Sequence, residues 1–326
     1  MASSQFVSDC TIDALSRAAK QLNDGNLIAF PTETVYGLGA DAQNVSAVSR
    51  IYKVKGRPQD HPLIVHIGDW QLMGEWAEEI SDFAIDLARA FWPGPMTLIL
   101  KRSELAKDFV TGNQNTVGIR VPNQTLALQL LNEFAKLGGK GIAAPSANRF
   151  GHVSPTTAEA VHEEIGAFLD TNDAILDGGP CSVGVESTII DCTGANPKIL
   201  RPGAITIEDI KSVTGLEVDS PADSDIRVSG SLENHYAPRA QVILDETPQL
   251  GDGLIALAEI PTPPGVIRLA APKSIEAFAH DLYAALREAD LKEIKRVVVA
   301  QPQGYGIAIA IRDRLIRAAA GRVIHD

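Results

Sequence analysis

Hydroxyl and cationic side chains gather in short stretches of this chain, each directly after an apolar or helical segment. The first stretch, Pro31-Thr32-Glu33-Thr34, follows the apolar residues 27–30, and the second, Lys55-Gly56-Arg57-Pro58, follows a helical pattern over 45–54. We expect Lys55 and Arg57 in a loop just past that helix. A guanidinium fork and an ammonium group both bind phosphate oxygens, and the glycine between them lets the backbone approach a ligand. The pattern predicts a site for an anionic ligand.

Later stretches add more polar groups at the ends of apolar runs. The strand predicted over 117–121 alternates apolar residues with Arg120, so its guanidinium points away from the apolar face. Ser146 and Asn148 follow another apolar run, and Ser154 precedes a helical pattern. Because open α/β sheets bind ligands where their strands end, we expect these groups to meet at such an edge.

Each of these groups also has a simpler structural interpretation. For Lys55 and Arg57 it is a solvated pair at a helix C-terminus, which the helix dipole favours. For Arg120 it is a structural ion pair. The remaining alternatives are a turn for Ser146 and Asn148, a helix N-cap for Ser154, and ordinary surface or core histidines for His61 and His66.

The elements that must position these groups alternate between short apolar runs and helical patterns, which indicates a mixed α/β fold. One such run, 185–191, predicts a strand with Ser187 on the same face as Val185 and Ile189. Periodicity fades between 215 and 234, where Ser, Asp and Pro accumulate, and resumes after Pro238. We therefore expect a first domain over 1–213, a linker over 214–239 and a smaller α/β domain over 240–326.

Charge and cysteine content limit the classes of function. The chain has 29 Lys+Arg against 41 Asp+Glu, a net charge of -12, which works against non-specific binding to long nucleic acid. Its three cysteines, Cys10, Cys181 and Cys192, form no C-x-x-C pair, so neither a disulfide framework nor a zinc site is indicated. No signal-peptide pattern or apolar run of roughly 20 residues stands out. We expect a soluble, cytoplasmic protein without membrane contact.

Common signatures of nucleotide, metal and covalent sites are missing from the sequence. There is no G-x-x-x-x-G-K-[ST] P-loop, no G-x-G-x-x-G after a strand and no nucleophile elbow. His162-Glu163-Glu164 lacks the second histidine of a zincin, and no acidic cluster resembles a metal cage. We expect no tightly held metal.

The order of the motifs resembles the YrdC/Sua5 family. The resemblance covers most of the first two hundred residues, and the matching stretches are 30–39, 55–58, 61–67, 92–97, 145–148, 154–156, 184–191 and 201–203. The stretch His235-Tyr236-Ala237-Pro238 and the α/β domain that follows it are similar to the long Sua5 form. It implies a YrdC-like twisted mixed α/β sheet domain with a cleft, followed by a smaller Rossmann-like α/β domain.

The same resemblance implies a nucleotidyltransferase, L-threonylcarbamoyladenylate synthase, which converts L-threonine, bicarbonate and ATP into threonylcarbamoyl-AMP, pyrophosphate and water. The product then passes to a tRNA threonylcarbamoyl transferase complex, which modifies adenosine 37 of tRNAs. Mg²⁺ is expected to bind with ATP by bridging its phosphates, and not to be held by a set of protein ligands. Strong direct binding of nucleic acid is not expected.

Roles for individual residues follow from the resemblance alone. It implies that the reaction centre contains Lys55, Arg57, Ser146 and Asn148. The residues implied to hold L-threonine are Thr34, His66, Arg120, Ala144 and Ser187. Those implied to contact ATP are Arg57, His61, Thr116, Ser146, Ser154, Arg201 and Tyr236.

Two other functions compete with this interpretation. A nucleic-acid-binding module is disfavoured by the negative net charge. A carbamoyl-transfer domain like that of hydrogenase maturation factors would normally accompany acylphosphatase and zinc-finger regions, which the sequence does not show. For the linker we hypothesise a lid, in which Tyr236 closes over ATP and keeps water from the adenylate, the alternative being a passive tether.

Overall fold

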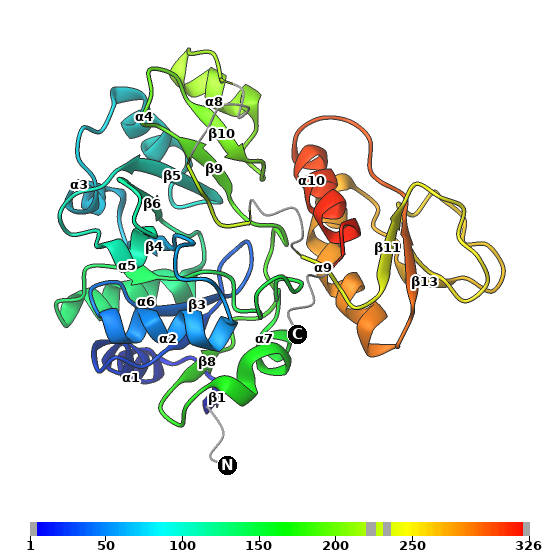
Figure 1. Ribbon diagram of the computed structural model, residues 1–326, viewed down its shortest axis with the longest axis horizontal. Coiled ribbons are helices and arrows are strands. Elements are labelled where there is room, and N and C mark those ends of the chain that lie inside the picture. The colour runs from blue at the N-terminus through cyan, green and yellow to red at the C-terminus, as the bar shows by residue number, and fades with distance from the viewer. Residues whose placement is uncertain (1–4, 220–225, 231–235, 322–326) are drawn as a thin grey trace.

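The computed structural model describes residues 5–219, 226–230 and 236–321 as two α/β units, each built on its own sheet (Figure 1). The mixed α/β class predicted from the sequence is confirmed. His235, the first residue of the His-Tyr-Ala-Pro stretch, lies outside the described residues. Within the described ranges, no helix is both long and apolar enough to cross a membrane.

The first unit contains a ten-stranded mixed sheet with the order β1-β8-β2-β3-β7-β4-β6-β5-β9-β10. Its strands are β1 (Gln5–Val7), β2 (Ile28–Phe30), β3 (Gly37–Asp41), β4 (Ile64–His66), β5 (Met96–Lys101), β6 (Thr116–Arg120), β7 (Ile142–Ala143), β8 (Ala174–Leu176), β9 (Thr188–Asp191) and β10 (Lys198–Arg201). Strands β4 and β6 pair in parallel, with His66 opposite Arg120. The register therefore brings together two polar residues that are distant in the sequence.

Helices cover both faces of this sheet. They are α1 (Ile12–Asn23), α2 (Val45–Lys55), α3 (Met73–Trp76), α4 (Asp82–Phe91), α5 (Asp108–Thr111), α6 (Thr125–Lys136), α7 (Ala158–Ile165) and α8 (Ile207–Thr214), with 3-10 turns η1 (Trp70–Leu72) and η2 (Gly166–Phe168). Ile28 and Phe30 of β2 pack with α1 and α6, whereas Ala29 packs in the larger core on the opposite face. Burial on both faces explains why this strand is apolar throughout.

Helix α2 brings Lys55 to the site. Asn44 caps the N-terminus by accepting hydrogen bonds from the backbone N–H groups of Ser46 and Ala47, and Gly56 ends the helix in the left-handed conformation. Lys55 is the last helical residue and only 2% exposed, so its predicted place in a loop is wrong. The apolar pattern ends at Val54, but the helix continues to Lys55 because its end is set by the C-cap Gly56.

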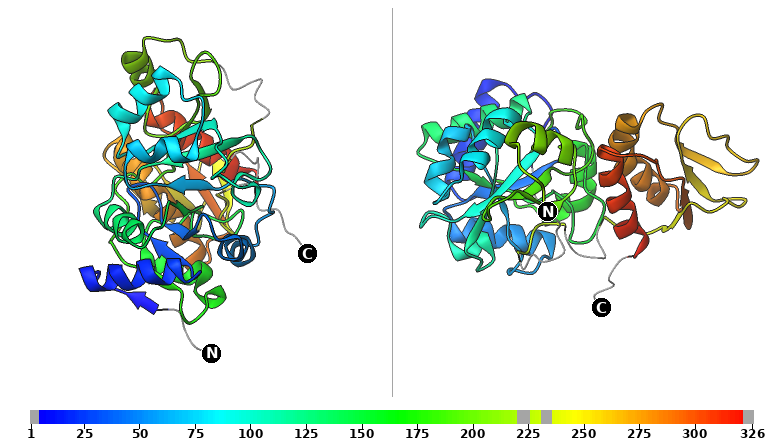
Figure 2. Two further views of the ribbon diagram at one scale, coloured as in Figure 1. Left: turned by 90° about the vertical axis from the view of Figure 1, so that its left-hand side faces the viewer. Right: turned by 90° about the horizontal axis from the view of Figure 1, so that it is seen from above.

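The second unit is a parallel four-stranded sheet with the order β11-β14-β12-β13. Its elements are β11 (Gln241–Leu244), β12 (Gly253–Ile255), β13 (Ile267–Ala270), α9 (Ile275–Leu291), β14 (Arg296–Val299) and α10 (Ile307–Ala319). Val297 and Val299 pack in one apolar cluster with residues of both helices. Helices α9 and α10 lie between this sheet and the first unit (Figures 1 and 2).

A shared apolar core joins the two units. Val35, Val153 and Val185 of the first unit belong to the same buried cluster as residues of α9 and α10. Arg287 of α9 also donates a hydrogen bond from Nη2 to the backbone carbonyl of Val153 at 2.5 Å. The second unit is therefore packed against the first and not only tethered to it.

The described residues 226–230 of the linker lie on the large sheet. Val228 packs with Ile64, Ile99 and Ile189 in one apolar cluster. The side chain of Gln114 accepts from the backbone N–H of Arg227 at 2.7 Å and donates to its carbonyl at 2.9 Å. Apolar contact and backbone hydrogen bonds together hold this segment against the sheet.

The contact between the units predicts different effects for two glycine substitutions. Gly184 has a φ of +84°, and a Cβ there would lie 2.5 Å from the carbonyl oxygen of Ala279 in α9. Gly179 has a φ of +77° and no heavy atom within 4 Å of its Cβ position. Both changes to alanine cost about 1–2 kcal/mol of backbone strain. Gly184→Ala is expected to lose a further ~1–3 kcal/mol to overpacking.

Thermal unfolding of the full chain measures this difference. Gly179→Ala is the matched control, since it carries the backbone strain without the clash. Equal losses of stability in the two variants would contradict the packing of α9 against the loop at Gly184.

Candidate active site

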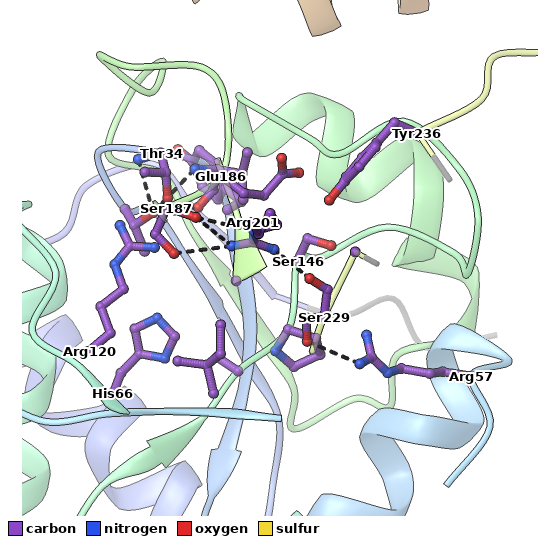
Figure 3. A pocket seen from close by; sticks show the side chains of 18 residues that line it. Thr34, Arg57, His66, Arg120, Ser146, Glu186, Ser187, Arg201, Ser229 and Tyr236 are labelled. Carbon is purple, nitrogen blue, oxygen red and sulfur yellow. Dashed lines mark hydrogen bonds between the residues drawn. The ribbon is translucent and has the colours of Figure 1, made fainter. Parts of the chain in front are cut away.

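A pocket lies over β4 and beside the loops that precede β3 and β9 and follow β7 (Figure 3). Ile64 and His66, two residues apart on β4, both line it, so the pocket covers a face of the sheet as well as strand ends. Nine of the residues predicted for the site line it: Thr34, Arg57, His66, Arg120, Ala144, Ser146, Ser187, Arg201 and Tyr236.

Two buried side chains from adjacent strands form one end of the pocket. Arg120 is 4% exposed, and its Nη2 lies 2.9 Å from Oε1 of Glu33, so the ion pair considered as an alternative is present. Burial, followed by the charge of Arg120, lowers the pKa of His66 to about 3, which leaves the ring neutral. In the described part of the chain, Nε of Arg120 and Nδ1 of His66 have no hydrogen-bond partner. Buried polar atoms in this state indicate a polar ligand.

Hydroxyl groups form the wall beside these two residues. The hydroxyl oxygens of Thr32 and Thr34 lie 2.9 Å apart, and that of Thr32 accepts from the backbone N–H of Val35 at 3.2 Å. The hydroxyl oxygens of Thr97 and Ser187 lie 2.8 Å apart. The hydroxyls of Thr34 and Ser187 are therefore held in place without a ligand.

Ser187 does not lie in a strand, because β9 begins at Thr188. Val185 packs in the cluster shared with the second unit, and Ile189 packs with the linker. The prediction that Ser187 shares a face with these two residues is therefore wrong. The loop before β9 is held by Arg201, whose Nε and Nη2 donate to the carbonyl of Ser187 at 3.1 and 2.9 Å.

Two buried arginines form the other end of the pocket, and Ser229 of the linker lies between them. Arg57 donates from Nη2 to the hydroxyl of Ser229 at 3.1 Å, and Arg201 donates from Nη1 to its carbonyl at 2.8 Å. Burial lowers the pKa of Arg57 to about 10, so it stays cationic at neutral pH. Two guanidinium groups at one end of a pocket suit a phosphate-bearing ligand.

Lys55 and Asn148 lie behind this lining and shape it. The Nζ atom of Lys55 donates to the carbonyls of Ser146 and Asn148 at 2.6 and 2.5 Å. Burial, followed by the charge of Arg57, lowers the pKa of Lys55 well below its usual value. Lys55 is thus no solvated cation at a helix end; it fixes the loop that carries Ser146.

The other three predicted residues, Ser154, Thr116 and His61, also lie outside the lining. Ser154 donates from its hydroxyl to Oε1 of Glu186 at 2.7 Å, and because Thr157 caps α7, the N-cap alternative for Ser154 is wrong. Thr116 lines a neighbouring hollow, which Ser229 lines as well. His61 packs edge-on against the ring of Phe150, with centroids 5.5 Å apart.

Nine of the lining residues have no role predicted from the sequence, among them Glu186, Ser229 and Gly230. Glu186 could have been predicted from the sequence, because it lies next to Ser187 in the same motif. Ser229 and Gly230 lie where periodicity fades, so no pattern marks them. Gly230 has a φ of +81°, and a Cβ there would lie 2.1 Å from the hydroxyl oxygen of Tyr236, so a larger residue would require that ring to move.

The pocket is lined by the carboxylate of Glu186 together with hydroxyls, guanidinium groups and the imidazole of His66. Among the residues that the structure describes, no three His, Cys, Asp or Glu side chains come together as a metal site requires. Glu186 accepts hydrogen bonds from Ser154, Tyr283 and Arg314. The pocket therefore offers cations and hydroxyls to a polar, anionic ligand.

Comparison with known proteins identifies the family. Residues 20–203 match the Sua5_yciO_yrdC family, described as "Telomere recombination", and residues 205–320 match Sua5_C, described as "Threonylcarbamoyl-AMP synthase, C-terminal domain". The chain is 38% identical to the threonylcarbamoyl-AMP synthase of Pyrococcus abyssi over 94% of each chain. It is 39% identical to that of Bacillus subtilis over 95% of this chain and 94% of the relative.

A solved structure agrees with these matches. The crystal structure of P. abyssi Sua5 complexed with L-threonine aligns with a TM-score of 0.87 at 36% identity, covering 98% of each chain. Both the sequence and the fold are therefore similar over nearly the whole length. The chain belongs to the YrdC/Sua5 family, in its long Sua5 form.

Proposed function

We propose that this chain is an L-threonylcarbamoyladenylate synthase, which converts L-threonine, bicarbonate and ATP into threonylcarbamoyl-AMP, pyrophosphate and water. The observation that carries this proposal is the composition of one pocket. It is lined by all five residues that are expected to hold threonine, and also by Arg57 and Arg201, which suit phosphate. The high-coverage relatives named threonylcarbamoyl-AMP synthase and the relative solved with L-threonine support it.

Threonine fits the end of the pocket at β4 and β6. The guanidinium of Arg120, with its unpartnered Nε, suits the carboxylate of an amino acid. The imidazole of His66 is neutral, so it can hydrogen-bond the ligand without carrying a positive charge. Arg120 is then the cation that binds the carboxylate at this end. The hydroxyls of Thr34 and Ser187 complete this end with groups that both donate and accept.

The reaction needs no protein nucleophile. The unprotonated amine of threonine attacks the carbon of bicarbonate, and loss of water gives a carbamate. A carbamate oxygen then attacks the α-phosphorus of ATP, the bond to the bridging oxygen breaks, and pyrophosphate leaves. We assign Arg57 and Arg201 to neutralise phosphate charge during this transfer, which is accelerated mainly by orientation and electrostatics. Lys55 acts by holding the loop of Ser146 and Asn148.

Mg²⁺ is proposed to enter with the nucleotide as MgATP, held by the phosphates. We further propose that the protein works in the cytoplasm and passes its product to a tRNA threonylcarbamoyl transferase complex. Its three cysteines are free thiols, which supports a reducing compartment.

Residues 226–230 and Tyr236 are proposed to form a lid over the nucleotide. Ser229 takes hydrogen bonds from both Arg57 and Arg201, so a nucleotide must displace this segment to reach the two arginines. Tyr236 lines the pocket and is 1% exposed. Closure of such a segment excludes water from a hydrolysable adenylate.

The activity itself gives the first test. Full-length protein with L-threonine, radiolabelled bicarbonate, ATP and Mg²⁺ is expected to release pyrophosphate only when threonine is present, with label in threonylcarbamoyl-AMP. Pyrophosphate release and chromatography of the product measure this, and the same mixture without threonine is the control. Release that does not depend on threonine would contradict the proposal.

The cations give the second test. Arg57→Ala is expected to lower kcat/KM by about 10²–10³-fold, because it removes charge neutralisation at the phosphates. Lys55→Ala is expected to lower both turnover and melting temperature, since the carbonyls of Ser146 and Asn148 lose their buried partner. The control is Lys53→Ala, an exposed lysine in the same helix turn. Wild-type kinetics in Arg57→Ala would exclude Arg57 from the reaction centre.

The lid gives the third test. Tyr236→Ala is expected to increase hydrolysis of threonylcarbamoyl-AMP and lower its yield per ATP consumed, because water reaches the adenylate. The ratio of product to pyrophosphate measures this effect. The control is Tyr305→Ala, a tyrosine of the second unit that is 86% exposed. An unchanged ratio in Tyr236→Ala would leave the linker as a passive tether.

A further inference from the structure

Glu186 places a negative charge in a pocket that otherwise presents cations to its ligand. It is 6% exposed and lines the pocket together with Arg57, Arg201 and Ser146 (Figure 3). A carboxylate at this position repels a phosphate-bearing ligand and competes with it for the arginines. The fold therefore has to compensate this charge.

The compensation comes largely from the second unit. Arg314 of α10 donates from Nε to Oε2 of Glu186 at 2.7 Å, and the hydroxyl of Tyr283 in α9 donates to the same oxygen at 2.9 Å. Ser154 of the first unit donates to the other oxygen at 2.7 Å. Arg314 is 1% exposed and also donates from Nη2 to the carbonyl of Pro202 at 3.0 Å. Both oxygens of Glu186 are thus occupied.

Because these bonds satisfy Glu186, Arg201 makes its own hydrogen bonds elsewhere. Burial opposes the charge of Glu186, but the charges of Arg314 and then Arg201 outweigh it and lower the pKa of Glu186 to about 2. Arg201 nevertheless directs its hydrogen bonds to Ser187 and Ser229. With Arg314 on the carboxylate, Arg201 keeps its orientation toward the loops that face the ligand.

The same two residues of the second unit hold Tyr236 of the linker. The rings of Tyr236 and Tyr283 are stacked with centroids 5.7 Å apart. The guanidinium carbon of Arg314 lies 5.2 Å from the ring centroid of Tyr236. Stacking and cation–π contact both favour this arrangement. One cluster therefore connects the second unit to the pocket wall and to the linker.

We propose that Arg314 and Tyr283 of the second unit are positioning residues for ATP binding, which bind Glu186 so that its charge neither repels the nucleotide nor draws Arg201 away from it. The proposal rests on the proposed function, because ATP is the anion assigned to this end of the pocket. The second unit thereby contributes charge compensation to the site, in addition to carrying the linker.

Arg314→Gln tests this proposal, because it is expected to change the KM for ATP but not the KM for threonine. The KM for ATP is expected to rise about tenfold or more, while the KM for threonine stays within about twofold, because the uncompensated carboxylate acts at the arginine end of the pocket. Adding Glu186→Gln to Arg314→Gln is expected to recover most of the loss, since the unpaired charge is then gone. The control is Arg312→Gln, on the same helix but bonded to the carbonyls of Pro302 and Gly304, which is expected to leave both KM values unchanged.

A second variant covers the case in which Arg314→Gln does not fold. Tyr283→Phe keeps the ring that stacks on Tyr236 and removes one donor to Glu186. It is expected to raise the KM for ATP about two- to fivefold in a protein that still unfolds cooperatively. Calorimetric titration of each full-length variant with ATP measures affinity without turnover. It separates this proposal from the proposed function, because weakened and then rescued ATP binding would support it even if no threonylcarbamoyl-AMP formed.

Three outcomes would overturn the proposal. One is a double variant that binds ATP no better than Arg314→Gln alone. Another is an equal rise in the KM values for ATP and threonine, which would indicate general disruption of the fold. The third is unchanged ATP affinity in both Arg314→Gln and Tyr283→Phe.

Discussion

Buried positive charge is the constraint on which the pocket depends. Lys55, Arg57, Arg120, Arg201 and Arg314 are each at most 7% exposed. A buried cation is tolerated only when acceptors surround it, because the interior does not replace the water that it loses. Here the acceptors are backbone carbonyls of several loops and three carboxylates, those of Glu33, Glu186 and Asp313. The bonds that stabilise the cations therefore also fix the loops that line the pocket.

The two ends of the pocket rest on different kinds of support. The end with His66 and Arg120 is set by the pairing of β4 with β6, so its geometry follows from the register of a sheet buried on both faces. The end with Arg57 and Arg201 depends on loops, on Ser229 of the linker and on helices of the second unit. Local rearrangement is easier in loops than in sheet cores, so the arginine end is where a ligand can displace protein groups. A net charge of -12 around this recessed, cationic end favours a small anion over a long polynucleotide.

Local patterns predicted much of the fold. Apolar runs and helical periodicity identified the mixed α/β class, the buried strand β2 and most of helix α2, because backbone conformation and burial of one element are encoded in neighbouring residues. Ordered motifs identified the family, and through it the nine predicted residues that line the pocket. These motifs are contiguous in the chain, so they are visible without knowledge of how distant segments meet.

Only the tertiary structure decided which charges compensate one another. Lys55 has the sequence context of an exposed helix end, yet it is buried against the carbonyls of residues 146 and 148. Ser187 fits a strand pattern, yet it precedes β9 and is held by Arg201. Glu186 and Arg314 are 128 residues apart and lie in different units. No local pattern contains such pairs, because the partner of a buried charge is chosen by the packing of whole elements and by the cost of leaving that charge unpaired.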